Sequence, residues 1–460
     1  MIDLENDFRI KLKSSNATER KEALEELLSY DLTDELIKLV SQLFTDEDKG
    51  VRDAASMLFT IQLYPQVPNH IVHYCFSDDI SIRNMAGEVL LKNGEYSIPA
   101  LMNELGKENS DDEKFLIDIL GWIGLPEPTL KIIDILRTNK DENVILACAE
   151  ALGNIKAEEA VPILLELLEN DKDEILTPTV MEALGKIGNK ETIDHFMKVY
   201  HKQDILTKYT IIESLGRVGD ADSLGFLLEE LQHTDSSLVG AIVKSSEQLL
   251  SSLGFEIELN DELKLIILKA LEEIDEDTVL AAVKLLYNYD NQEIIEAFVS
   301  IYGTIESLDY MLKEKLFQTH NISCNFILDR INENCKNTKQ LLALYKEMSF
   351  MKEELGIEPL SDSNKLKFLN TLSKLIDNPD EEIRMTSAEL LFHINPKDAL
   401  LFADKIINDD NIWNRLKLIE LLGDVNEIEA VEILKKLAED SEEMVKERAI
   451  SLLEEKRTRI

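Results

Sequence analysis

Apolar residues between positions 141 and 168 recur at spacings of three and four, which is the period of an amphipathic helix. The first apolar stripe consists of Val144, Cys148, Ala151, Leu152 and Ile155. The second stripe follows a short turn and consists of Val161, Leu164, Leu165 and Leu168. Pro162 suits the first turn of the second helix, where its missing N–H is least harmful. The stretch therefore predicts two antiparallel helices, each apolar along one side.

The same pattern is repeated along the chain. Leu152-Gly153 has counterparts at Leu120-Gly121, Leu184-Gly185 and Leu215-Gly216, so the glycines are 32, 32 and 31 residues apart. A fixed period of this size indicates stacked repeats, each covering the apolar side of its neighbour. Over the length of the chain, this period predicts an all-α, right-handed α-solenoid of about 12 to 14 antiparallel helix pairs.

Glycines also mark the predicted end of each first helix. The Leu-Gly glycine is expected to end that helix. A second glycine three residues later, at Gly124, Gly188 or Gly219, suits a left-handed cap. Lys156, Asn395 and Asn426 take the place of this second glycine in other repeats.

The openings of several first helices carry the motif Asp-x-x-Val/Ile-Arg. It is present at Asp48-x-x-Val51-Arg52, Asp79-x-x-Ile82-Arg83 and Asp380-x-x-Ile383-Arg384. With the Ala-Leu-Gly-x-Ile motif, it makes the chain resemble HEAT-repeat proteins of the short-unit bacterial type, similar to the phycobilisome-lyase HEAT-like repeats. The resemblance is strong over residues 45–235 and 378–440 and weak over residues 250–376. It implies a solenoid that binds protein partners, with its second helices on the concave side.

Three segments are predicted from the regularity of the repeats. Residues 1–250 form an N-terminal HEAT-like array, and residues 251–377 form irregular helical repeats with a bend. Residues 378–460 form C-terminal repeats ending in a capping helix. Within the irregular segment, the alternation over residues 255–259 suggests a short extended stretch, and residues 356–364 suggest a loop.

The charge of the chain limits its partners. With 90 acidic and 49 basic residues, the net charge is −41. A field of this sign repels nucleic acids and anionic membranes and attracts basic peptides, although solvated helix faces alone would also explain the acids. We therefore expect a protein partner, with a basic segment as one option, and neither nucleic acid nor membrane.

Cysteine usage and the N-terminal sequence indicate a cytoplasmic protein, and we separately expect it to be a monomer. Four cysteines do not make a disulfide framework in a chain of 460 residues, and Cys148 falls at a core position of its repeat. The first residues lack the apolar run of a signal peptide, and no segment reaches the length of about 18 apolar residues that a membrane span needs.

The sequence offers no catalytic, cofactor or metal site. His70, His73 and Cys75 are close in sequence, but a closed zinc site needs four ligands and no second cluster pairs with them. None of the histidines is followed by glutamate, as the di-iron sites of HEAT-like deoxyhypusine hydroxylases require. Packing is favoured over exposure for Trp122 and Trp413.

Acidic residues on the outer faces of the second helices are the predicted partner-binding site. They are Asp134, Glu158, Glu159, Glu166, Glu169, Glu229 and Glu230, a series interrupted by Lys198. A second candidate is the adaptable cluster of Met348, Phe350 and Met351, for which core packing is the favoured interpretation.

Two classes of function follow from these residues and the resemblance. The first is a non-catalytic scaffold or adaptor that binds a protein on its acidic second-helix surface. The alternative is a lyase-like or chaperone-like protein that presents a chromophore or small ligand to a client protein. A third possibility, DNA recognition as in HEAT-like alkylpurine glycosylases, requires a basic groove and is disfavoured by the charge.

Overall fold

The computed structural model describes residues 2–107, 109–170, 176–234, 236–254, 257–333, 335–350 and 362–459. Every regular element in these ranges is an α-helix or a short 3-10 helix, and none is a strand. The predicted all-α solenoid of antiparallel helix pairs is therefore confirmed. The chain divides into two compact units, Met1–Glu258 and Leu259–Ile460, here called the N-terminal and C-terminal units.

The N-terminal unit consists of two parallel rows of helices preceded by α1 (Ile2–Lys11), a helix that the repeat pattern does not predict. The first-helix row comprises α2 (Ala17–Leu27), α4 (Lys49–Ile61), α6 (Ile80–Asn93), α8 (Ser110–Ile123), α10 (Glu142–Ile155), α12 (Leu176–Ile187), α14 (Ile205–Val218) and α16 (Ser236–Leu253). The second-helix row comprises α3 (Asp34–Gln42), α5 (Val67–Ile71), α7 (Ile98–Glu104), α9 (Thr129–Thr138), α11 (Val161–Asn170), α13 (Lys190–Val199) and α15 (Ala221–His233).

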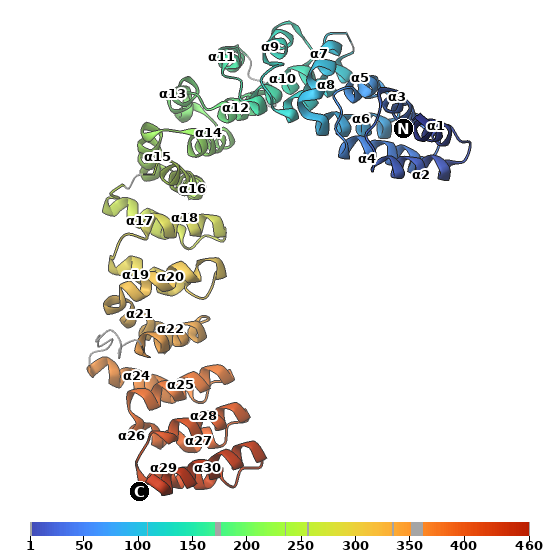
Figure 1. Ribbon diagram of the computed structural model, residues 1–460. Helices are drawn as coiled ribbons and strands as arrows, with labels where there is room; N and C mark the ends of the chain where they lie inside the picture. The colour runs from blue at the N-terminus through green and yellow to red at the C-terminus, as the bar shows by residue number, and fades with distance from the viewer. Residues whose placement is uncertain are drawn as a thin grey trace. The chain divides into compact units, whose positions relative to one another are not determined.

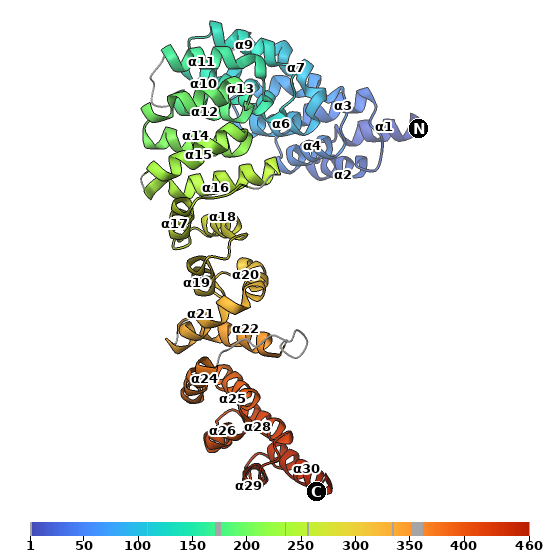
Figure 2. The same cartoon turned by 90° about the vertical axis from the view of Figure 1, so that its left-hand side faces the viewer.

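The C-terminal unit repeats this arrangement, and its helix pairs are stacked one above another in Figure 2. Its first helices are α18 (Glu276–Leu286), α20 (Glu306–Gln318), α22 (Thr338–Phe350), α25 (Glu381–Ile394), α28 (Ile412–Gly423) and α30 (Glu443–Arg459). Its second helices are α17 (Asp261–Ala270), α19 (Gln292–Ile301), α21 (His320–Asn332), α24 (Asp362–Leu375), α26 (Pro396–Ala399) with α27 (Ala403–Ile407), and α29 (Ile428–Leu437).

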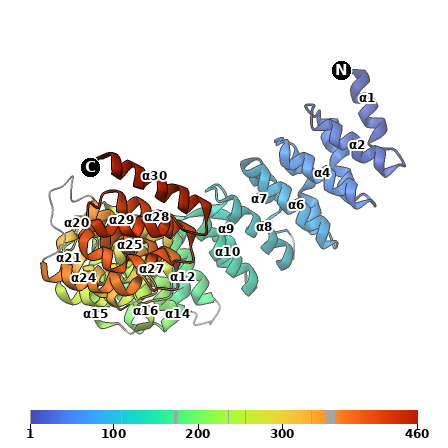
Figure 3. The ribbon, with the colours of Figure 1, turned by 90° about the horizontal axis from the view of Figure 1, so that it is seen from below.

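The N-terminal unit follows an arc, and the first-helix row lies on its inner side. Figure 1 shows α10, α12, α14 and α16 inside α9, α11, α13 and α15, and Figure 3 shows α4, α6, α8 and α10 as one successive row. The expectation that the second helices occupy the concave side is therefore wrong for this unit. The first helices contact one another in the series α8, α10, α12, α14 and α16.

Small residues explain why the inner row packs so closely. A Cβ added to Gly121 would lie 2.7 Å from the Cα of Ala151, and one added to Gly153 would lie 2.7 Å from the Cα of Ala183. These glycines lie inside α8 and α10 and do not end them, which corrects the sequence interpretation. Their role is to let successive helices approach on the concave side.

The left-handed caps are confirmed in part. Gly124 and Gly188 have φ values of 72° and 65°, and Lys156 adopts the same region with φ 59°. Gly219 has φ −67°, so its requirement for glycine is spatial, since an added Cβ would lie 2.4 Å from the Leu215 carbonyl oxygen. Asn395 is also outside this region, with φ −150°, because its side chain accepts from Asp398 N and caps α26.

The Asp-x-x-Val/Ile-Arg motif caps one helix and ties it to the next repeat. Asp380 accepts hydrogen bonds from the backbone N–H groups of Glu382 and Ile383 at the start of α25. Arg384 makes two hydrogen bonds to Asp409, at 2.7 and 2.9 Å, and Arg83 pairs with Asp112 at 2.8 Å. These bidentate or charge-assisted contacts hold the start of one repeat against the next.

Every regular element that the structure describes in the irregular middle segment is a helix. Residues 255 and 256 of the predicted extended stretch lie outside the described residues, and residues 257–260 have no regular structure. Of the predicted loop, residues 356–361 lie outside the described residues, whereas residues 362–364 belong to α24. The division into segments 1–250, 251–377 and 378–460 stays a prediction.

Candidate partner-binding surface

The acidic residues predicted on the second helices lie mostly on the outer side of the N-terminal unit. Asp134 on α9, Glu166 on α11 and Glu229 on α15 are exposed. Glu158 and Glu159 are also exposed, in the 3-10 turn that precedes α11. Because the second helices form the outer row in Figure 1, this surface is convex and does not enclose a ligand.

Two members of that predicted set differ from the rest. Glu230 is only 8% exposed, and its carboxylate lies 3.3 Å from His201 Nε2, so it is packed inside the repeat. It cannot contribute to an exposed acidic surface. Glu169 belongs to α11, but its side chain lies outside the described residues.

The predicted methionine cluster does not form a described surface. Met348 is 6% exposed and its sulfur lies 3.9 Å from Cys324 Sγ, which confirms core packing for this residue. The side chain of Phe350 and all of Met351 lie outside the described residues. The three residues therefore stay a prediction as a binding site, except that Met348 is buried.

An uninterrupted series of acids lies instead on the inner side of the N-terminal unit. We call it the inner acidic column, and it comprises Glu88, Asp118, Glu150, Glu182 and Glu213, on α6, α8, α10, α12 and α14. Each follows a buried residue by two positions, as Glu150 follows Cys148. At about 100° per residue, this offset places the acid nearly opposite the core stripe. The column therefore lies on the side of the arc's hollow, where four of its members are exposed and the Asp118 side chain is 14% exposed.

Local ion pairs distinguish the members of the column. Lys114 lies 2.6 Å from Asp118, and Lys186 lies 2.8 Å from Glu182, each one turn away on the same helix. Among the described residues, no ion pair involves Glu88, Glu150 or Glu213. Of these three acids, Glu150 alone is followed one turn later by an uncharged residue, Asn154, whereas Lys92 and Arg217 follow the others. Glu150 is thus the acid with the least local competition for a cation from outside.

Exposed apolar side chains accompany the column. Trp122, on α8, is 60% exposed and lies one turn after Asp118, on the same face. Tyr209 on α14 is 38% exposed, and it lies one turn before Glu213. Trp413, on α28, is also 63% exposed, so the interpretation that the two tryptophans are packed is wrong. The Trp122 indole offers a flat apolar surface beside carboxylates, which is suited to a cationic side chain with an aliphatic stem.

A groove between α4 and α6 continues this inner face toward the N-terminus. It has a volume of about 500 Å³ and is lined by Asp53, Ser56, Met57, Thr60, Ser81, Asn84, Met85 and Glu88. Met57 occupies the place in α4 that acids occupy in the following helices, and it is 54% exposed. The groove combines two adaptable thioethers with the carboxylates of Asp53 and Glu88.

In the C-terminal unit, the position equivalent to Glu150 is occupied by Glu389, and two lysines compensate its charge. Glu389 follows its N-cap Asp380 by nine residues, as Glu150 follows Asp141. It is 6% exposed, lies 3.0 Å from Lys417 of α28 and also pairs with Lys346 of α22. This hydrogen bond to Glu389 raises the pKa of Lys417, with Glu420 contributing less. Here the carboxylate joins three helices and is not available to a partner.

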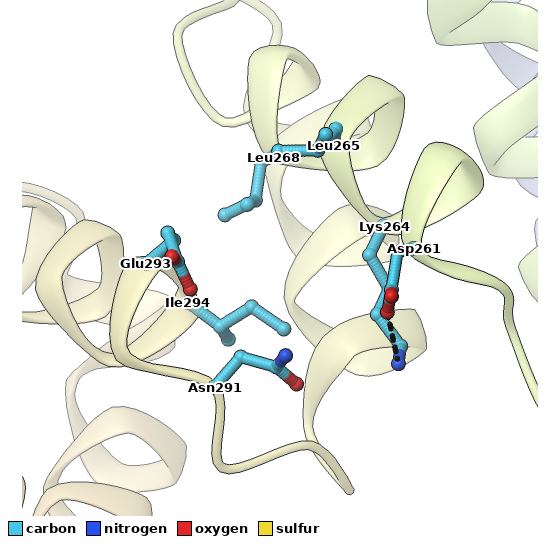
Figure 4. Close-up of a pocket in the computed structure, with 7 residues that line it drawn as sticks. All are labelled: Asp261, Lys264, Leu265, Leu268, Asn291, Glu293 and Ile294. Carbon is cyan, nitrogen blue, oxygen red and sulfur yellow. Dashed lines mark hydrogen bonds and ion pairs between the residues drawn. The ribbon is translucent and has the colours of Figure 1, made fainter.

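A second, smaller groove lies between α17 and α19 in the C-terminal unit (Figure 4). Its volume is about 260 Å³, and it is lined by Asp261, Lys264, Leu265, Leu268, Asn291, Glu293 and Ile294. Lys264 is held at its edge, 3.3 Å from Asp261 and 4.4 Å from the centre of the Tyr289 ring. Leu265, Leu268 and Ile294 provide the apolar part of its lining, and the other four residues are polar.

Three of the four cysteines, Cys75, Cys148 and Cys324, are buried free thiols. Burial raises the pKa of the Cys75 thiol to about 12, with the Arg83 charge opposing it, and burial raises that of Cys324 to about 12. Burial and the neighbouring charge of His70 lower the pKa of His73. No three described His, Cys, Asp or Glu side chains are grouped as metal ligands.

None of the described helices combines the length and apolar character of a membrane span.

Comparisons with known proteins give a sequence-profile match and a similar solved structure. A sequence profile described as HEAT repeats matches residues 98–180 and 369–454. No curated protein matches the chain. Among solved structures, importin beta crystallised in a polyethylene glycol condition is similar with a TM-score of 0.49 and 12% identity, over 98% of this chain and 77% of that chain. The profile match shows HEAT repeats in these two regions, and the stacked helix pairs show an all-α solenoid.

Proposed function

We propose that the chain is a non-catalytic scaffold that binds a basic segment of a protein partner along the inner face of its N-terminal unit. HEAT-repeat solenoids commonly act as protein-interaction scaffolds. The observation that carries the proposal is the inner acidic column, which runs without interruption over five consecutive first helices. Trp122 and the α4/α6 groove add apolar contact area on the same face.

The charge of the whole unit supports a basic partner. Residues 1–258 contain 49 acidic and 24 basic side chains, a net charge of −25. On a concave surface such a field concentrates cationic ligands and speeds their association. The exposed second-helix acids, including Glu166 and Glu229, are the competing proposal, since they share this charge but lie on the convex side. No feature of the described residues favours the lyase-like or chaperone-like alternative.

Charge reversals on the two faces separate these proposals. Glu150→Lys with Glu213→Lys alters the inner face, and Glu166→Lys with Glu229→Lys alters the outer face by the same charge. Binding of a fluorescently labelled arginine-rich peptide is measured by anisotropy over a range of salt concentrations. We expect the inner pair to weaken binding about tenfold or more and to flatten its salt dependence, while the outer pair changes it by less than about threefold.

The same measurement identifies the outcomes that contradict the proposal. A larger loss of peptide affinity from the outer double substitution would indicate that the partner binds the second helices. Equal losses of affinity from both double substitutions would indicate attraction by net charge without a defined binding face. Circular dichroism of each variant controls for folding, because all four positions are exposed and their substitution leaves the cores intact.

A further inference from the structure

We infer that the partner segment binds in polyproline II conformation, with a cationic side chain at every third residue directed at successive helices of the inner face. This inference rests on the proposed function and adds the conformation and register of the partner. It starts from the spacing of the column. Each first helix from α6 to α14 supplies one acid, and these helices contact one another in sequence order.

The spacing between successive acids follows from helix packing. Packed helices are about 8 to 10 Å apart, and small residues at the contact bring them toward the lower value. Here Gly121 meets Ala151, Gly153 meets Ala183, and Gly185 meets Ser214. The acids therefore recur about every 8 to 10 Å along the arc.

Only one regular extended conformation matches this distance. Polyproline II advances about 3.1 Å per residue with three residues per turn, so side chains on one side recur about every 9 Å. A β-strand repeats its side chains about every 6.6 Å, and an α-helix about every 5.4 Å. A β-strand or helix would thus lose register with the column within two helices. Polyproline II also leaves the peptide carbonyl groups free to accept hydrogen bonds.

Side chains one turn along from the acids suit those carbonyl groups. The positions four residues after the members of the column are Lys92, Trp122, Asn154, Lys186 and Arg217. All five side chains carry N–H donors, and Lys186 already donates to Asn154 Oδ1 at 3.0 Å. Trp122 supplies a ring on which a guanidinium group can stack. The face therefore offers carboxylates to the cations and donors to the backbone.

The occupant is a segment of another protein, and not a second copy of this chain. Charge complementarity decides between the two, because a chain with net charge −41 repels its own copies. A segment with one arginine per turn also provides the aliphatic stems that Met57 and Met85 can contact in the α4/α6 groove. The chemistry recognised is thus an extended Arg-x-x or Lys-x-x repeat.

Two peptides of identical composition test the register. One has the sequence (Arg-Pro-Ala)5, and the other has its five arginines in one block followed by five Pro-Ala pairs. Both are titrated into the full chain carrying Trp413→Phe, which leaves Trp122 as the one tryptophan. We expect the spaced peptide to bind about tenfold tighter than the block and to change the emission of Trp122.

Two substitutions on adjacent first helices, Glu150→Gln on α10 and Glu182→Gln on α12, provide a matched comparison. We expect Glu150→Gln to weaken the spaced peptide about threefold to tenfold. Glu182→Gln should weaken it less, because Lys186 already occupies that carboxylate at 2.8 Å. Both substitutions keep the shape of the side chain and remove one charge.

The outcomes separate this inference from the proposed function. Equal affinity of the two peptides, with both weakened by Glu150→Lys and Glu213→Lys, would overturn the register and leave the inner face as the binding site. Failure of both peptides to bind, or binding that ignores the inner reversals, would overturn the proposed function and with it the inference. Tighter binding of the block peptide would contradict the polyproline II spacing but would not contradict the proposed function.

Discussion

The role of an acidic side chain in this protein depends on its neighbours and not on its place in the repeat. Glu150 and Glu389 occupy equivalent positions, yet Glu150 is exposed, whereas Glu389 is buried with Lys346 and Lys417 beside it. A buried carboxylate is costly unless its charge is compensated, and removing it leaves the lysines without their partner. The two residues therefore have opposite expected effects on stability and binding.

We expect Glu389→Ala to lower the free energy of unfolding by about 1 to 3 kcal/mol, because it removes a buried charge-assisted network between three helices. Glu150→Ala is expected to change it by less than about 0.5 kcal/mol, as is usual for exposed sites. Urea unfolding followed by circular dichroism measures both. A larger loss from Glu150→Ala would contradict the assignment of roles.

Individual residues differ in how well the sequence predicts them. The repeat alignment correctly places Cys148 in the core, because its counterparts in neighbouring repeats are apolar. It does not reveal that Glu230 is buried beside His201, since that contact joins a 3-10 turn to the following second helix. Trp122 also escapes prediction, because hydrophobicity favours burial while its helical position is opposite the core.

At the scale of helices, the spacing of apolar residues predicts the pairs but not which row is concave. The periodic pattern identifies the buried side of each helix, as in α10. The direction of curvature depends on residue size at the contacts between repeats. The Leu-Gly glycines, interpreted from sequence as helix ends, lie at these contacts, whereas the expectation of concave second helices rests on the HEAT resemblance.

The packing role of Gly153 leads to a direct test. Gly153→Ala would place a Cβ 2.7 Å from the Ala183 Cα, so the two helices must separate, and we expect a loss of about 1 to 3 kcal/mol in the free energy of unfolding. Gly225→Ala is the control, because that helical glycine has open space around it, and it should stabilise α15 by up to about 1 kcal/mol. Thermal unfolding of the two variants distinguishes them, and equal shifts of either sign would contradict the packing role.

The contact between successive repeats at Arg384 predicts a dependence on pH. Burial alone would raise the pKa of Asp409, but the hydrogen bonds from Arg384 and Asn414 outweigh it and the pKa is lowered. A carboxyl with a lowered pKa in the folded state contributes stability above its unfolded value of about 3.9, and loses it as the pH falls through the folded value. The loss attributable to Asp409 should therefore occur below about pH 4.

Substituting Asp409→Asn isolates this contribution. We expect the variant to be less stable than the unmodified chain at pH 6, and the difference between them to shrink as the pH is lowered from 4 toward 2. Urea unfolding at several pH values measures the difference. A stability difference that stays constant over this range would show that the charge of Asp409 does not contribute.

At the scale of the whole molecule, stability is distributed among neighbouring repeats. Each helix pair contacts mainly the pairs before and after it, so no single core unites the chain. The described contacts nevertheless divide it into the units Met1–Glu258 and Leu259–Ile460. Regularity of the sequence predicted boundaries near residues 250 and 377, because sequence reveals where the repeat motif weakens and not where contacts between helices are few.

Fragments ending at the two kinds of boundary separate these descriptions. A cut after residue 258 follows the division between units, and we expect fragments 1–258 and 259–460 each to be helical and to unfold cooperatively. A cut after residue 377 instead separates α22 and α24 from α25, which contacts both, and breaks the pairs Lys339 with Glu382 and Lys346 with Glu389. Fragment 378–460 would then expose the apolar side of α25, so we expect it to unfold at lower urea concentration than fragment 259–460. Circular dichroism and limited proteolysis measure both. Equal stability of the two fragments would favour residue 377 as a folding boundary and support the three-segment division.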